Sequence, residues 1–342
     1  MNNRTEISAL GEFGLISHLT EKFKLANESS IKGVGDDSAV LDYKDKLALV
    51  TTDLLLEGVH FDLTYVPLKH LGYKSAVVNF SDAYAMNGRP KQLTVSLGLS
   101  KRFSVEDLEL FYDGLKLACD VYGVDLVGGD TSASLTGFSI SITCIGEAEK
   151  DKVVYRSGAK ETDLICVSGD LGAAYMGLQL LEREKKVFAD IKDFTPNFEG
   201  KEYLLERQLK PEARKDIIEI LDKAGIVPTS MIDVSDGLSS ELLHISKQSN
   251  VGCQIYEERI PIDFQTASMA EEFNMNLVTA ALNGGEDYEL LFTVPLAMHD
   301  KVAEIKGIKV IGHITKASLG NYIVGRDGGE IELKAQGWNS LK

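Results

Sequence analysis

The stretch Leu93-Thr-Val-Ser-Leu-Gly-Leu99 alternates apolar residues with small or polar ones, and Phe138-Ser-Ile-Ser-Ile-Thr-Cys144 repeats this pattern. A period of two is typical of a strand with one buried face. Between these stretches, Ser104-Val-Glu-Asp107 has the chemistry of a helix start and is followed by apolar residues at helical spacing. The first half of the chain is therefore expected to combine helices with a sheet of antiparallel type.

The pattern continues outward in both directions from this stretch. A further helix is predicted over residues 71–86, which end in the turn residues Asn87-Gly-Arg-Pro90. After the charged residues 147–152 an apolar strand begins again, and we place a domain boundary near residue 150. The later elements are strands at 164–167, 231–234, 288–294 and near Val310, with helices at 173–181 and 238–247. Residues 184–203 show little periodicity and are predicted to form a surface excursion.

Composition narrows the class of protein. The 342 residues favour two domains of ordinary size, and 44% hydrophobic with 26% charged residues is typical of a globular protein. A net charge of −16 with no basic run makes nucleic acid an unexpected partner. No apolar segment suits a signal peptide or a membrane span, so we expect a cytoplasmic location and no membrane partner.

The cysteines offer no metal or redox motif. They lie far apart in the chain and form no C-x-x-C pair. We expect reduced core residues at all four positions, Cys119, Cys144, Cys166 and Cys253.

Five short segments share one design, in which acidic residues lie beside Gly, Ser or Thr at the end of an apolar element. They are Gly33-Val-Gly-Asp-Asp-Ser38, Thr51-Thr-Asp53, Asn79-Phe-Ser-Asp82, Val127-Gly-Gly-Asp-Thr131 and Ile232-Asp-Val-Ser-Asp-Gly237. Any one alone is more often an ordinary turn. Five together, if they converge, would require a cation to offset their repulsion, and Mg²⁺ prefers such oxygen ligands. The glycines could bring backbone N–H groups to phosphates, but clustered carboxylates would repel a free polyphosphate. Metal ions would then have to bridge carboxylate and phosphate, so the pattern indicates Mg–ATP.

Other nucleotide and metal motifs are absent. The chain has no G-x-x-x-x-G-K-[ST] loop, and Gly33-Val-Gly-Asp-Asp-Ser38 departs from G-x-G-x-x-G. An EF-hand beginning at Asp233 is excluded because its glycine comes too early and His244 stands where a bidentate Glu belongs. Calcium is therefore not favoured.

For several other residues, the sequence leaves both a functional and a structural interpretation open. A sixth segment, Asn283-Gly-Gly-Glu-Asp-Tyr288, places Glu286 and an aspartate on a glycine turn, where they could bind a metal, a substrate or nothing. His60 could reach the site of Asp53 or be structural, and Arg156 could hold a phosphate or lie on the surface. Trp338 could stack on an aromatic substrate or cover the core.

Read in order, these segments resemble the thiamine-monophosphate kinase family. The matching motifs are Gly33-Val-Gly-Asp-Asp-Ser-Ala-Val40, Thr51-Thr-Asp53, Val78-Asn-Phe-Ser-Asp82, Val127-Gly-Gly-Asp-Thr131, Arg156-Ser-Gly-Ala159, Asp233-Val-Ser-Asp-Gly-Leu238 and Gly284-Gly-Glu-Asp-Tyr-Glu-Leu290. They span nearly the whole chain, and their content differs from that of other members of the wider superfamily, such as aminoimidazole ribonucleotide synthetase.

The resemblance implies a fold and a reaction. The fold would be the two-domain aminoimidazole ribonucleotide synthetase-like fold, with an α/β N-terminal domain in residues 1–150 and an α+β C-terminal domain in residues 151–342. The N-terminal sheet would pair with that of a second subunit, which implies a homodimer. The reaction would convert ATP and thiamine phosphate into ADP and thiamine diphosphate by direct in-line transfer.

The resemblance also implies site residues, which we carry over position by position. The ligands of several Mg²⁺ ions would be Asp37, Thr51, Thr52, Asp53, Asp82, Asp130, Asp233 and Asp236. The contacts to ATP would be Tyr112, Gly129, Asp130, Arg156 and Ser235. Thiamine phosphate would be bound by His60, Glu286 and Trp338, and catalysis would depend most directly on Asp53, Asp130 and Arg156.

Rival functions remain to be separated. Selenide water dikinase is expected to carry a reactive cysteine in an N-terminal glycine-rich loop, whereas the first cysteine here is Cys119 in a predicted helix. The hydrogenase maturation factor is expected to end in a cysteine, and this sequence ends in Asn339-Ser-Leu-Lys342. A non-catalytic protein that binds Mg–nucleotide as a sensor or scaffold is the alternative from another class.

Overall fold

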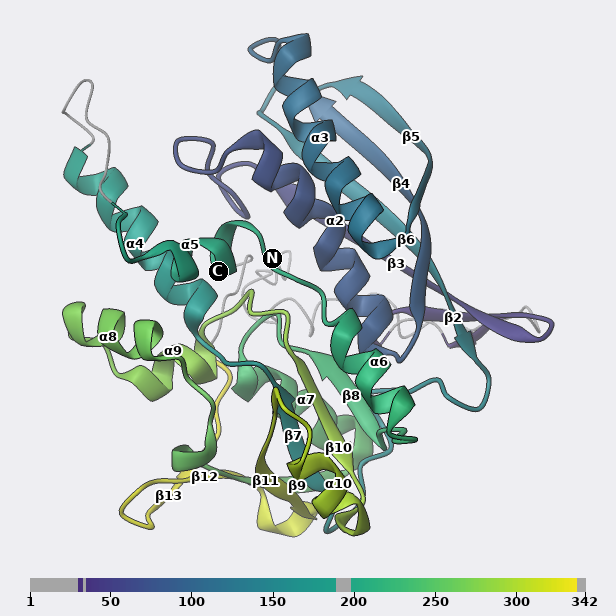
Figure 1. The fold of residues 1–342 in the computed structure, drawn as a ribbon, viewed down its shortest axis with the longest axis vertical. Helices are drawn as coiled ribbons and strands as arrows, with labels where there is room; N and C mark the ends of the chain where they lie inside the picture. The colour runs from purple at the N-terminus through teal and green to yellow at the C-terminus, as the bar shows by residue number, and fades with distance from the viewer. Residues whose placement is uncertain (1–29, 33–34, 189–197, 337–342) are drawn as a thin grey trace, which may run out of the picture.

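The computed structural model describes residues 30–32, 35–188 and 198–336, and within them the chain forms two mixed β-sheets with helices packed against them (Figure 1). The first sheet is built from residues 30–149 and the second from residues 164–332. The expected fold class is confirmed. The exact division of the chain into domains at residue 150 stays a prediction.

The first sheet has the strand order β1-β2-β3-β6-β4-β5. Its strands are β1 (Ser30–Lys32), β2 (Ala39–Tyr43), β3 (Lys46–Leu56), β4 (Arg89–Leu99), β5 (Asp125–Ala133) and β6 (Ser139–Glu149). The expectation of an antiparallel sheet was wrong at one pair, because β4 and β5 run parallel. Helix α3 (Val105–Tyr122) joins these two strands, and a parallel pair requires such a crossover.

Helices α2 (Leu68–Ala85) and α3 cover one face of this sheet (Figure 1). Ser104 and Asp107 form the predicted capping box at the start of α3. The two helices touch backbone to backbone, since a Cβ on Gly72 would lie 1.9 Å from the carbonyl oxygen of Phe111, and a Cβ on Gly114 would lie 1.8 Å from that of Lys69. Glycine at both positions therefore permits this close crossing.

The second sheet has the order β13-β12-β9-β11-β7-β10-β8, with β12 and β9 parallel and the other pairs antiparallel. Its strands are β7 (Leu164–Ser168), β8 (Ser230–Asp233), β9 (Val251–Tyr256), β10 (Leu290–Val294), β11 (Ile308–Lys316), β12 (Asn321–Val324) and β13 (Glu330–Glu332). The α-helices of this half are α4 (Ala173–Phe188), α5 (Glu202–Leu209), α6 (Lys215–Lys223), α7 (Leu238–Ser249), α8 (Phe264–Glu272), α9 (Leu277–Asn283) and α10 (His299–Ala303). Short 3-10 turns lie at η2 (Glu257–Arg259), η3 (Leu296–Met298) and η4 (Ala317–Leu319).

The predicted excursion over residues 184–203 was wrong at both ends. Helix α4 continues to Phe188 and α5 already begins at Glu202, while residues 189–197 lie outside the described part of the chain. The end of α4 carries Lys185 and Lys186 on its exposed surface, and a solvated turn shows no apolar period.

One apolar core runs through both halves of the molecule. Phe80 and Tyr84 of α2 belong to the same buried cluster as Ile217 of α6, Met231 of β8 and Phe292 of β10. Helix α2 is consequently enclosed on nearly all sides, with buried residues along almost its whole length. Groups on α2 can therefore be held in fixed positions relative to the second sheet.

The four cysteines are buried and form no disulfide, as expected. None of the helices in the described ranges has the length and apolar character needed to cross a bilayer.

Candidate active site

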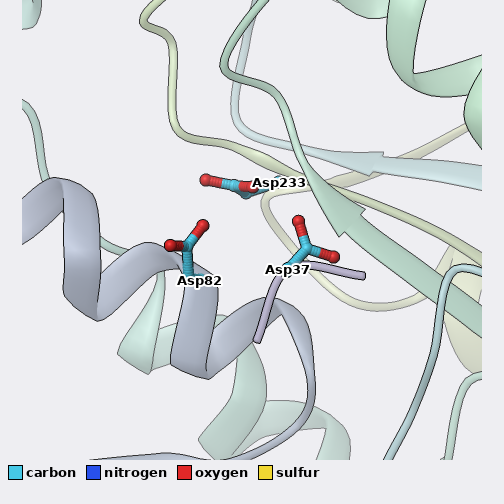
Figure 2. Close-up of side chains that lie close together, drawn as sticks. All are labelled: Asp37, Asp82 and Asp233. Carbon is cyan, nitrogen blue, oxygen red and sulfur yellow. The ribbon is translucent and has the colours of Figure 1, made fainter. Parts of the chain in front are cut away.

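Three aspartates from distant parts of the chain meet between the two sheets. Asp37 lies in the loop before β2, Asp82 in the last turn of α2, and Asp233 at the end of β8 (Figure 2). One carboxylate oxygen from each lies within 4.8 Å of the others. This acidic cluster, Asp37, Asp82 and Asp233, could hold a metal ion.

Hydroxyl groups from neighbouring elements orient the acidic cluster. The Thr51 hydroxyl on β3 donates to Asp82 Oδ2, and the Ser81 hydroxyl donates to Asp233 Oδ2 at 2.6 Å. Asp53 lies two residues beyond Thr51, on the same face of β3, because side chains alternate along a strand. Three of the five acidic segments form parts of a helix or a strand rather than turns, since residues 51–53 lie in β3, 79–82 in α2 and 127–131 in β5.

The electrostatics of the cluster favour a bound cation. Burial raises the pKa of Asp53 to about 6 and also raises the pKa of Asp233. Burial, and then the charge of Asp53, raise the pKa of Asp82 well above its ordinary value. Asp82 also stands in the last turn of a helix, where the macrodipole opposes negative charge. Such an arrangement costs stability unless a positive charge compensates it.

Arg156 supplies part of that positive charge. Its Nε and Nη2 atoms donate to the two carboxylate oxygens of Asp37 at 2.9 and 2.6 Å. Burial raises the pKa of Asp37 to about 6, although Arg156 acts in the opposite direction. The guanidinium thus lies at the edge of the acidic cluster, within reach of an anion bound there.

Thr52 lies apart from this group. Its side chain is on the opposite face of β3 from Thr51 and Asp53, where its hydroxyl donates to the carbonyl oxygen of Ile142 at 3.0 Å. Its predicted role as a metal ligand finds no support in the position of the hydroxyl.

Gly129 and Asp130 lie on β5, the exposed edge strand. Two strands separate β5 from β3, which puts these residues roughly 14 Å from Asp53. Asp130 also stands in the cross-strand row of Ser96, Ser141 and Leu54, on the face opposite Asp53. Within one chain, Asp130 therefore cannot share an ion with Asp53.

Tyr112 and Ser235 are the other residues predicted to contact the nucleotide. Tyr112 is exposed on α3. Ser235 and Asp236 directly follow β8, and their backbone N–H groups donate to Glu241 Oε1 at 3.0 and 2.7 Å. Glu241 is buried and shapes this turn from within α7. Glu241 lies outside the set of residues predicted from the sequence. The feature that could have indicated it is an acidic residue in the first turn of the helix that follows the 232–237 segment.

The substrate candidates are divided. His60 lies in the turn after β3, and its Nδ1 accepts from the backbone N–H of Leu56 at 3.0 Å. Glu286 lies in the loop before β10, next to the Ser235 turn, and its N–H donates to the Ser235 carbonyl oxygen at 2.7 Å. Trp338 lies outside the described residues.

Comparison with known proteins identifies the group to which this site belongs. The model of the AIR synthase related protein, N-terminal domain, matches residues 35–148. The thiamine-monophosphate kinase of Aquifex aeolicus is 39% identical over 289 residues, covering 84% of this chain and 87% of that protein. The Bacillus subtilis thiamine-monophosphate kinase is 32% identical, covering 97% of this chain and 100% of that protein. The chain belongs to the thiamine-monophosphate kinase family.

Solved structures agree with the family. The structure of AaThiL complexed with AMPPCP and TMP has a TM-score of 0.83 and 34% identity, covering 99% of both chains. The hydrogenase maturation protein HypE in complex with ATP shares only the fold, with a TM-score of 0.68 at 19% identity. The thiamine-monophosphate kinase motifs thus occur on a fold that other ATP-binding proteins also use.

Proposed function

We propose that this chain transfers the γ-phosphoryl group of ATP to thiamine phosphate. A phosphate oxygen of thiamine phosphate forms the new bond to the γ-phosphorus, the bond to the β-phosphate oxygen breaks, and ADP leaves with that oxygen. Membership of the thiamine-monophosphate kinase family supports the reaction. The observation that carries it in the structure is the acidic cluster, in which Asp37, Asp82 and Asp233 converge beside Arg156.

Magnesium is the proposed metal, and several ions are expected. Carboxylate oxygens form the cluster, with the Thr51 hydroxyl beside Asp82, and such oxygens are the hard ligands that Mg²⁺ prefers together with phosphate. Asp37, Asp53, Asp82 and Asp233 would hold the ions, with Thr51 beside them, while Thr52, Asp130 and Asp236 stay predicted ligands. Bound ions would neutralise the phosphates and allow two anionic reactants to approach.

Positioning is the main contribution of the protein itself. A phosphate oxygen is already a nucleophile, so the reaction requires no strong general base, and orientation with charge neutralisation suffices. Arg156 is the proposed phosphate donor: once a cation takes up the charge of Asp37, its guanidinium can turn to ATP. Gly129, Ser235 and Tyr112 are proposed to contact the nucleotide, and His60, Glu286 and Trp338 the thiamine phosphate.

A homodimer is proposed from the first sheet. Among the described residues, helices cover one of its faces, and the other carries Leu54, whose exposed fraction is 56%. Val127 on β5 is 58% exposed, and within the described part of the chain β5 has no strand paired to its outer edge. A second subunit would cover both and would bring a second site near Asp130. Light scattering on the purified protein should give twice the chain mass; a monomer at micromolar concentration would contradict the dimer.

The assay that tests the function uses purified protein with ATP, thiamine phosphate and Mg²⁺. Thiamine diphosphate and ADP should form in equal amounts, and Asp82→Asn should abolish their formation while leaving the protein folded. If ATP binds but no thiamine diphosphate forms, the chain is a nucleotide sensor rather than a kinase. We propose the cytoplasm as its location, where ATP and Mg²⁺ are supplied.

A further inference from the structure

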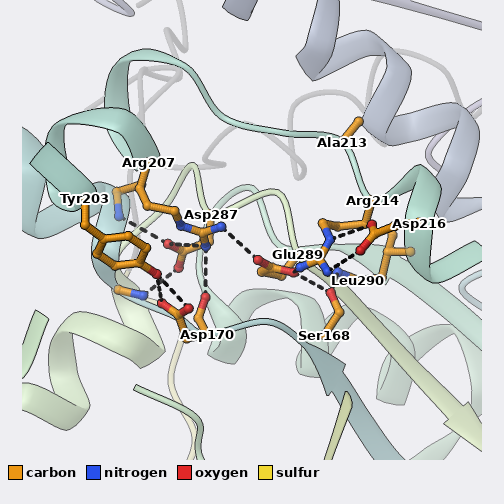
Figure 3. Close-up of polar contacts among 12 residues, drawn as sticks. Ser168, Asp170, Tyr203, Arg207, Ala213, Arg214, Asp216, Asp287, Glu289 and Leu290 are labelled. Carbon is orange, nitrogen blue, oxygen red and sulfur yellow. Dashed lines mark hydrogen bonds and ion pairs between the residues drawn. The ribbon is translucent and has the colours of Figure 1, made fainter. Parts of the chain in front are cut away.

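The loop of residues 284–289, which precedes β10, carries three acidic side chains with different surroundings. Asp287 accepts hydrogen bonds from the backbone N–H groups of Gly172 at 2.7 Å and Ala174 at 3.3 Å, at the start of α4. Glu289 accepts from Arg207 Nη1 at 2.8 Å and is also paired with Arg214 (Figure 3). Both side chains are buried, and each of their carboxylate oxygens has a hydrogen-bond or ion-pair partner.

Glu286 differs from these two acids because its side chain remains 29% exposed. Its backbone is in the left-handed region, with φ at 66°, where a residue other than glycine is strained. The loop also packs tightly on the Ser235 turn, since a Cβ on Gly285 would lie 2.5 Å from the Ser235 carbonyl oxygen. Strain of this kind persists only where the surroundings hold it, and it is common at ligand sites.

Lys74 of α2 holds the Glu286 carboxylate from the other half of the molecule. Its Nζ lies 2.9 Å from Glu286 Oε1 and donates to the carbonyl oxygen of Gln208, at the end of α5, at 3.0 Å. The Gln208 side-chain amide donates to the second oxygen, Glu286 Oε2, at 2.8 Å. Three residues from α2, α5 and the 284–289 loop thus form a closed ring of polar contacts.

The helix that carries Lys74 also carries the acidic cluster. Ser81 lies seven residues after Lys74, on the same face of α2, and bonds Asp233. Asp82 follows it, about 12 Å along the helix from Lys74 at 1.5 Å per residue. One rigid helix therefore fixes the metal end of the site and the Glu286 end together. This suits a substrate with a phosphate at one end and an amine-bearing heterocycle at the other.

We propose that Lys74 is a positioning residue for thiamine phosphate, holding Glu286 so that the exposed edge of its carboxylate faces the heterocycle. This inference rests on the proposed role of Glu286 in the thiamine-monophosphate kinase reaction. Lys74 itself is buried, with 7% of its side chain exposed, so we assign its effect to Glu286 rather than to a contact of its own with the substrate. Its effect is on the orientation of Glu286, because a carboxylate held at both oxygens has little freedom to rotate.

Steady-state kinetics on Lys74→Met test the proposal. The KM for thiamine phosphate should rise about tenfold, the effect of ~1.4 kcal/mol, while the KM for ATP stays unchanged. Lys69→Met, at an exposed position of the same helix, is the matched control and should behave as wild type. Lys74→Arg, which keeps the charge, should recover part of the affinity. Equal losses for both substrates would show a merely structural role and overturn the proposal.

A double-mutant cycle separates this inference from the role of Glu286. Glu286→Gln alone should raise the KM for thiamine phosphate, and the Lys74→Met, Glu286→Gln double variant should be no worse than Glu286→Gln. Additive effects would overturn the positioning role of Lys74. A wild-type KM in Glu286→Gln would instead refute the proposed role of Glu286, whatever Lys74→Met does. Circular dichroism on each variant confirms that the protein compared is folded.

Discussion

At the scale of single residues, the buried carboxylate of Asp53 is proposed to act in catalysis but lowers the stability of the fold. Burial raises the pKa of its carboxyl group to about 6, so the ionised form opposes folding. We expect Asp53→Asn to lower kcat roughly 100-fold, because catalytic electrostatics are lost, while raising the melting temperature measured in EDTA. Asp151→Asn, at an exposed turn, is the control for both readouts. Near wild-type turnover at limiting Mg²⁺ would remove Asp53 from the metal site.

Asp130 is expected to have a different role from Asp53. Its position on the opposite face of the sheet means that, in the proposed site, Asp130 would bind a different ion from Asp53 or act in a different subunit. The two residues therefore cannot be treated as one ligand pair.

His244 of α7 gives a pH-dependent prediction. Burial, and then the charges of Arg156 and Lys247, lower its pKa from 6.5 to about 4. The folded protein thus binds this proton less readily than the unfolded chain, so stability is lost as the pH falls from about 6.5 towards 4. Over this range wild type should lose on the order of 2 kcal/mol more than His244→Gln, measured by urea unfolding. Parallel acid curves for the two proteins would show that His244 has an unshifted pKa.

At the scale of elements, the close crossing of α2 and α3 determines whether replacing a glycine of α3 raises or lowers the stability of the protein. Alanine usually stabilises a helix relative to glycine, by about 1 kcal/mol. At Gly114, however, the new Cβ would lie 1.8 Å from a backbone oxygen of α2 that cannot move aside. We expect Gly114→Ala to destabilise the protein by roughly 3 kcal/mol in urea unfolding and to reduce activity, because α2 carries Asp82.

Asp113→Ala, on the exposed side of α3, is the control for the Gly114 variant. It should leave stability almost unchanged, because it places alanine in the same helix without touching α2. A Gly114→Ala protein as stable as this control would mean that the helices can separate freely.

At the scale of the whole molecule, metal binding should stabilise the junction of the two halves, since the acidic cluster joins a loop, α2 and β8. Burial raises the pKa values of Asp37 and Asp53 to about 6, so in EDTA the contribution of these two carboxyl groups to stability is lost as the pH rises through 6. At pH 8, Mg²⁺ at about 100 times its Kd should restore about 2.7 kcal/mol. The gain should be smaller at pH 5, where protons compete; an equal rise in melting temperature at both values would contradict this.

The sequence by itself determined the element types, the family and the acidic motifs, because these depend on local periodicity and on residue order along the chain. The capping box at Ser104 and the strands β4 and β6 were predicted from neighbouring residues alone, whereas β5 was missed because its residues 127–131 have the composition of a Gly-rich turn. Tertiary structure decided which motifs meet. It brought Asp37, Asp82 and Asp233 together and left Asp130 on another strand and face, since strand order is set by crossovers and packing.

The polar contacts beyond the motifs also depended on the tertiary structure. Lys74 is an ordinary helix residue in the sequence, and only the packing of α2 between the sheets pairs it with Glu286, more than 200 positions later in the chain. Periodicity shows which face of an element is buried, but the partner on the other side of that face comes from contacts between distant segments. For that reason the sequence determined the chemistry of the site, and the fold determined its geometry.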